Sequence, residues 1–178
     1  HHALPQSLQA AADSYLQSLQ RLYPAPEWIG TRAVMPDHPV TDSAVISLGD
    51  RDLHLQAWPV AHTDSDLSVF DPATGTLFTG DLLFRDLTPV VEGSLTGWLD
   101  WMDADPASGA RLIVPGHGPA ATTWAEASEP QRVFLTALAA ETRRAIDAGL
   151  ALSEAVPAIA TALQPLGKTW ASYRATVQ

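Results

Sequence analysis

Residues 67–84 read LSVFDPATGTLFTGDLLF, and this stretch decides the class of fold. Two short runs in it, Leu67–Phe70 and Thr76–Thr79, have the composition and length that are typical of strands. Residues 71–75, which lie between them, combine Asp, Pro and Gly, and these residues favour a tight turn. The stretch therefore predicts a β-hairpin, and Gly80-Asp81 is expected to end its second strand.

Strand patterns continue on both sides of this hairpin. Upstream, Ala44–Leu48 and Leu53–Trp58 predict two further strands, because apolar residues alternate in them and Gly49-Asp50 supplies a turn between them. Downstream, the apolar run Arg111–Pro115 predicts a buried strand that ends in Gly-His-Gly-Pro. The segment 44–119 is thus expected to be rich in β-structure.

Helical periodicity occupies the N-terminal end of the chain and one connection between strands. In Leu4–Leu22 the apolar residues recur at three- and four-residue steps, which predicts a helix. Residues 94–103 predict a short helix with Ser94 or Thr96 as its N-cap. Its two tryptophans, Trp98 and Trp101, are expected to lie in the core.

The last third of the chain, residues 128–178, is predicted to be a helical tail. One helix is expected from Ser128 to Asp147, because Gly149 is a typical stop signal. A second is expected over 153–163, and a third from Thr169 onward. The first of these helices should pack on the core through Val133, Phe134, Leu138 and Ile146. Strands with interleaved and appended helices indicate an α/β or α+β protein.

Composition limits the possible functions. The chain has 178 residues, of which 46% are hydrophobic and 17% are charged, as expected of one domain with a real core. It contains no apolar run long enough to cross a membrane, so no membrane insertion is expected. The net charge of −10 and the single lysine, Lys168, oppose nucleic-acid binding. Because Cys is absent, a metal site would have to use His, Asp or Glu.

Three polar residues lie a few residues at most beyond the ends of predicted strands. They are His62, Asp81 and His117, and two of them follow a glycine that lets the backbone approach a ligand closely. Taken singly, each has an ordinary explanation as a hydrogen-bonded or turn residue. Together, two imidazoles and a carboxylate form a ligand set that suits zinc, iron or manganese.

The sequences around these residues resemble those of a known family. Residues 61–66 (AHTDSD), 79–84 (TGDLLF) and 114–118 (VPGHG) are similar, in order, to the third, fourth and fifth metal-binding motifs of the metallo-β-lactamase superfamily. Residues 92–98 (EGSLTGW), Trp58 and the helical tail further resemble the quinoprotein relay system zinc metallohydrolase branch. The resemblance implies the second half of an αββα sandwich with a helical C-terminal extension.

The resemblance also implies a role for each residue. His62 would be a terminal ligand of a first zinc, His117 a terminal ligand of a second, and Asp81 the catalytic carboxylate that bridges both. Apart from the resemblance, the position of Asp64 and Asp66 beside His62 predicts that they either orient its imidazole or cap the following turn. The implied activity is hydrolysis of an ester, a thioester or a related bond in a small molecule by a metal-bound hydroxide. A periplasmic or exported location is implied as well.

One expected motif of the superfamily, His-x-His-x-Asp-His, is absent from the sequence. Residues 1–178 are therefore expected to form a single partial domain that lacks the N-terminal half, with a helix at 4–22, a β-rich metal-site half at 44–119 and the tail at 128–178. Such a fragment is expected to be inactive alone, and its exposed sheet would favour a homodimer.

Two alternatives to zinc hydrolysis remain open at this stage. The first is a non-catalytic binding or assembly relative without a complete metal site. The second is an iron-dependent enzyme of the persulfide dioxygenase type, because two His and one Asp suit iron as well as zinc.

Overall fold

The computed structural model describes residues 4–25, 27–32, 34–167 and 170, and it contains a five-stranded sheet with helices. The described elements follow one another as α1 (Leu4–Leu22), β1 (Ser43–Ser47), β2 (Asp52–Ala57), β3 (Leu67–Asp71), β4 (Thr76–Phe84), α2 (Leu95–Asp103), β5 (Leu112–His117), α3 (Trp124–Asp147) and α4 (Leu152–Gly167). The predicted α/β class is confirmed. None of the described helices has the length and apolar character needed to cross a membrane.

The strands lie in the sheet in their sequence order, β1-β2-β3-β4-β5. Neighbours from β1 to β4 are antiparallel, so both predicted hairpins are confirmed. The last strand, β5, runs parallel to β4, and the connection between them carries α2, as a parallel pair requires a crossover. The ends of β4 and β5 therefore point to the same edge of the sheet.

The predicted end of β4 at Gly80-Asp81 is wrong. The strand continues to Phe84, although its pairing with β5 shifts register between Phe78 and Gly80 and again between Gly80 and Phe84. Gly80 adopts a φ of +54°, a conformation that glycine tolerates, so the irregularity is absorbed within the strand. As a result Asp81 sits inside a bulged strand and not in a free loop.

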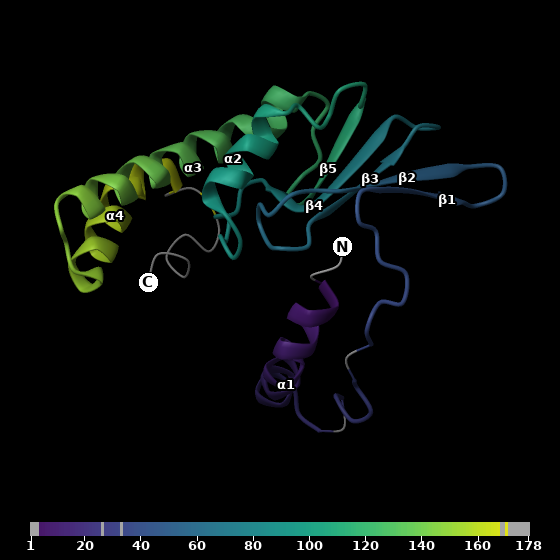
Figure 1. Cartoon of the computed structure of the whole chain (residues 1–178), viewed down its shortest axis with the longest axis horizontal. Coiled ribbons are helices and arrows are strands. Elements are labelled where there is room, and N and C mark those ends of the chain that lie inside the picture. The colour runs from purple at the N-terminus through teal and green to yellow at the C-terminus, as the bar shows by residue number, and fades with distance from the viewer. Residues whose placement is uncertain (1–3, 26, 33, 168–169, 171–178) are drawn as a thin grey trace.

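The core lies on one face of the sheet. Leu77 and Ile113 pair across β4 and β5 and are almost fully buried, whereas Phe78, the next residue of β4, is 44% exposed on the opposite face. Trp98 and Trp101 of α2 belong to the same core, as predicted. Figure 1 shows α2 and α3 beside β4 and β5, with the α3–α4 pair extending beyond the sheet and α1 lying apart from it.

The helices differ from their predicted bounds mainly in the tail. Helix α1 occupies the predicted residues, and α2 begins after Ser94, whose side chain caps it as expected. Helix α3 begins at Trp124 and not at Ser128, because Thr123 supplies the N-cap and accepts a hydrogen bond from the backbone of Glu126. Helix α4 extends past Leu163 to Gly167, and the helix predicted from Thr169 falls almost entirely outside the described residues.

The predicted inner face of α3 is partly wrong. Phe134 is buried and Leu138 packs against the core, but Val133 is 40% and Ile146 is 62% exposed. Ile146 lies near the C-terminal end of α3, in the part of the helix that extends past the sheet beside α4 (Figure 1). A helix longer than the surface it covers leaves part of its apolar stripe exposed.

An ion pair fixes the turn between β3 and β4. The guanidinium of Arg51 donates hydrogen bonds to the carboxylate of Asp71, and the side chain of Thr74 donates another, at 2.5 Å. These contacts, led by Arg51, hold the pKa of Asp71 at about 2, below its usual value of 3.8. The fold thus stabilises the charged carboxylate.

Acid should therefore weaken the fold through Asp71. The stability that the charged Asp71 contributes is complete above the usual pKa of an aspartate, and it is lost as the pH falls from about 4 to about 2. Denaturant unfolding of the wild-type chain and of Asp71→Asn at several pH values measures it. The difference in free energy of unfolding between the two should shrink across this window, and a constant difference would contradict the assignment.

Candidate functional site

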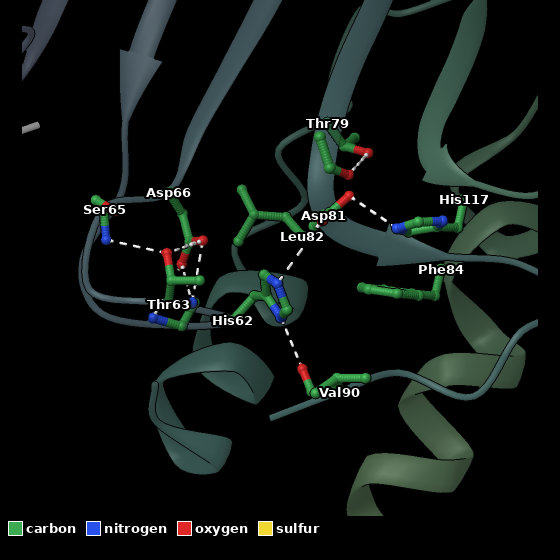
Figure 2. Close-up of polar contacts among 12 residues, drawn as sticks. His62, Thr63, Ser65, Asp66, Thr79, Asp81, Leu82, Phe84, Val90 and His117 are labelled. Atoms are coloured by element: carbon green, nitrogen blue, oxygen red, sulfur yellow. Dashed lines mark hydrogen bonds and ion pairs between the residues drawn. The ribbon is translucent and has the colours of Figure 1, made fainter. Parts of the chain in front are cut away.

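The three predicted site residues come together at one end of the sheet. His62 lies in the loop between β2 and β3, Asp81 in the bulged part of β4, and His117 at the end of β5. The Nε2 atom of His62 is 3.9 Å from Oδ2 of Asp81, and the Nε2 atom of His117 is 3.4 Å from Oδ1. Asp81 thus lies between the two imidazoles, which face different oxygens of its carboxylate (Figure 2).

The orientation of His62 is fixed by a backbone carbonyl. Its Nδ1 lies 2.7 Å from the carbonyl oxygen of Val90, and because a carbonyl can only accept, Nδ1 carries the proton. In the tautomer with a single proton on Nδ1, the lone pair is on Nε2, the atom that faces Asp81. The His62 side chain is only 9% exposed, so this arrangement is also confined by packing.

The loop around His62 is held by Asp66. Its carboxylate accepts hydrogen bonds from the backbone N–H groups of Ala61 and Thr63, which flank His62, and from the Thr63 hydroxyl at 2.8 Å. Burial raises the pKa of Asp66, and the hydrogen bonds from Thr63 oppose this shift. Asp66 therefore acts on the backbone that carries His62, while Val90 takes the contact with the ring. The role of Asp64, which is half-buried, stays a prediction.

Asp81 requires a glycine across from it. A Cβ atom added to Gly116 would lie 2.1 Å from Oδ1 of Asp81 and 2.7 Å from the carbonyl oxygen of Gly80. Any other residue at this position would force the carboxylate or the strand to move. The glycine before His117 thus leaves room for the Asp81 carboxylate, whose side chain is 48% exposed.

The segment that carries His117 is held by Arg85. The backbone N–H of Arg85 donates to the carbonyl of His117 at 2.9 Å. Its guanidinium donates to the carbonyls of Pro119 and Ala120 at 2.7 Å each, and to Glu126 of α3. Sequence analysis missed Arg85, whose only signal was its position directly after the Gly-Asp-Leu-Leu-Phe stretch.

A buried glutamine holds the end of β4 against α3. The side chain of Gln131 accepts from the backbone N–H of Phe84 at 2.7 Å and donates to the carbonyl of Leu82 at 3.0 Å. Trp98 donates to the same carbonyl at 2.7 Å. These bonds replace the ladder partners that the register shifts take from the strand. A polar residue inside a helix gave no sign of this role in the sequence.

The three side chains are of types that bind divalent metal ions, but they are too few to complete the coordination of an ion. Two bonds of about 2.0–2.2 Å to one ion can join donor atoms up to about 4 Å apart, so each His–Asp81 pair could share an ion. A zinc site takes at least three protein ligands, and here each carboxylate oxygen faces one imidazole. Among the residues that the structure describes, no group of three or more His, Asp or Glu side chains is arranged to hold a metal ion by itself.

The sequence profile of the metallo-beta-lactamase superfamily matches residues 8–117, which contain all three site residues. The chain belongs to this superfamily. Among curated proteins, by contrast, none matches significantly. The finer assignment to the quinoprotein relay branch stays a prediction.

Solved structures agree with this fold. A metallo-beta-lactamase family protein from Thermus thermophilus has a TM-score of 0.52 and 20% identity, covering 77% of this chain and 48% of its own. A double mutant of the sec-alkyl sulfatase PisA1 from Pseudomonas sp. has a TM-score of 0.52 and 18% identity. The match covers 79% of this chain and 24% of the sulfatase. A metallo-beta-lactamase from Pontibacter korlensis has a TM-score of 0.50 and 16% identity. This match covers 74% of this chain and 61% of that enzyme's chain. The chain thus spans less than two thirds of each of these structures.

Proposed function

We propose that the chain carries part of the active site of a zinc-dependent hydrolase. One observation supports this most directly: the Nε2 atoms of two histidines, one in the β2–β3 loop and one at the end of β5, face the two oxygens of one carboxylate. If divalent metal ions bind here, His62, Asp81 and His117 would be the donors that this chain contributes. Donors from outside the described residues would complete each coordination shell.

The residues of this chain have distinct tasks in the proposed site. Asp81 supplies the negative charge and two oxygens at the exposed centre of the site. His62 offers Nε2 because Val90 holds the proton on Nδ1. His117 lies at the solvent side, since its side chain is 45% exposed. Zinc, when bound, lowers the pKa of a coordinated water toward neutrality and polarises a substrate carbonyl.

We propose an ester, a thioester or a related bond in a small molecule as the substrate, because residues 79–84 resemble the corresponding stretch of thioester hydrolases of the same fold. Membership of the quinoprotein relay branch, and with it a periplasmic or exported location, forms part of the proposal. It rests on the resemblance of residues 92–98 and the helical tail.

Two substitutions test the metal site. In protein that also carries the donors completing each site, His62→Ala and His117→Ala should each weaken zinc binding at least about tenfold and lower the hydrolysis of nitrophenyl esters and thioesters in parallel. His54→Ala, in an exposed position of β2, is the matched control and should change neither. Calorimetric titration with zinc and a colorimetric assay give the two readouts.

The same experiment separates the alternatives. Equal losses of zinc affinity and hydrolysis in His54→Ala and in the two site variants would contradict a metal site at Asp81. If purified protein holds iron and consumes oxygen, the iron-dependent alternative replaces zinc hydrolysis. If zinc affinity is unaffected by either site substitution, the proposed role of the two histidines is wrong.

A further inference from the structure

Phe84 touches both imidazoles of the site. Its ring stacks on that of His117, with centroids 4.7 Å apart and planes 21° from parallel. It meets the ring of His62 edge to face, with centroids 5.5 Å apart. Figure 2 shows the Phe84 ring below that of His117 and to one side of His62. In the described part of the chain, no other aromatic ring contacts both histidine rings.

The two histidines are oriented by different means. His62 is held through the hydrogen bond between its Nδ1 and the carbonyl of Val90. For the His117 ring, the described residues provide no hydrogen bond, and its polar contact is with Asp81. The His117 side chain is also 45% exposed, so few atoms confine it. Stacking on Phe84 is therefore the contact that sets the plane of its ring.

Phe84 is itself held firmly. It is 5% exposed, and its backbone N–H donates to the buried side chain of Gln131. Its ring meets Trp98 at 6.1 Å in an edge-to-face arrangement. A side chain that is fixed at its backbone and on several sides of its ring can impose its position on a more exposed neighbour.

The strand register links this ring to Asp81. After the second register shift, Phe84 pairs with His117 across β4 and β5, and Asp81 precedes it by three residues in the same strand. One strand thus presents both the carboxylate and the ring against which the opposite histidine stacks. The pairing of β4 with β5 thus contributes to the separation between His117 and Asp81.

We infer that Phe84 is a positioning residue, an aromatic spacer that sets the ring plane of His117 and its distance from His62 for binding a divalent metal ion at Asp81. The part that concerns the ion rests on the proposed function. The part that concerns the rings does not, because it is a statement about the metal-free protein.

The first test measures the rings directly in the metal-free chain by NMR. In the wild type, stacking should shift the His117 ring protons upfield and give cross-peaks between them and the Phe84 ring. Phe84→Leu should remove this upfield shift, and Phe84→Tyr, which keeps the ring, should restore it. Phe134→Leu is the matched control, because Phe134 is equally buried but packs against Trp170 away from the site.

The second test measures zinc affinity in the same proteins. Phe84→Leu should weaken zinc binding about 10–100-fold, as loss of a residue that orients a ligand does, and Phe84→Tyr should recover most of it. Phe134→Leu should leave the affinity unchanged. A general loss of stability would instead affect Phe84→Leu and Phe134→Leu alike.

The outcomes separate this inference from the proposed function. If none of the proteins binds zinc but the His117 ring protons lose their upfield shift in Phe84→Leu, the proposed metal site is wrong and the inferred role of Phe84 is correct. If zinc binds but the His117 protons do not respond to Phe84→Leu, the inference is overturned. If Phe84→Leu does not fold, the wild-type cross-peaks decide, because their absence would exclude stacking in solution.

Discussion

In protein that carries the remaining zinc donors, Asp81→Asn should weaken zinc binding by at least about 100-fold and lower kcat/KM to a similar extent. Loss of a residue that only orients a ligand typically costs about 10–100-fold, and Asp81 faces both histidines directly. The substitution removes the negative charge at the centre of the site and replaces one of two acceptor oxygens by a donor. Calorimetric titration with zinc and an ester hydrolysis assay measure the two effects.

The stability of the metal-free chain should respond differently to the same change. The Asp81 side chain is 48% exposed, so Asp81→Asn should change the free energy of unfolding of the chain by no more than about 0.5 kcal/mol. Asp100→Asn, at an exposed position of α2, is the control and should leave both zinc affinity and stability unchanged. If Asp81→Asn binds zinc as the wild type does, Asp81 is not a ligand.

The sheet was predictable where local pattern and tertiary structure agree. Alternating residues and the two turn signals were enough for the hairpins β1–β2 and β3–β4, because each strand pairs with its neighbour in sequence. The end of β4 was not predictable. Gly80 reads as a stop, yet the strand continues because Gln131 and Trp98, remote in sequence, bind its backbone.

The helical tail illustrates a different limit. Periodicity located α3 and α4, but it assigned Ile146 to the core although α3 extends past the sheet there. The pattern of a helix reports which residues could pack together. It does not report how far the sheet against which the helix packs extends.

For the site, the sequence indicated which residues but not what holds them. His62, Asp81 and His117 were singled out because each follows a predicted strand, and the structure brings them together. Their roles as ligands remain predictions. The residues that position them, Phe84 and Gln131, have no chemical signature, since an apolar and an amide side chain occur throughout any protein.

Trp98→Ala should lower the free energy of unfolding by about 3–5 kcal/mol, the range for removing a large buried aromatic side chain. Trp98 is fully buried, and its ring lies 5.0 Å from that of His62 and 6.1 Å from that of Phe84. Its indole also donates to the carbonyl of Leu82, which keeps a second donor in Gln131. Most of the loss should therefore come from the cavity and not from an unpaired carbonyl.

Two further variants separate these contributions. Trp98→Phe keeps most of the ring volume and should cost less than Trp98→Ala, since it loses one hydrogen bond worth about 1 kcal/mol and part of the packing. Tyr23→Ala, at a half-exposed position outside the core, should change stability by about 0.5 kcal/mol or less. Equal losses for Trp98→Phe and Trp98→Ala would assign the effect to the hydrogen bond. Because the cavity would open beneath His62 and Phe84, Trp98→Ala should also weaken zinc binding, which links the core of the sheet to the site at its edge.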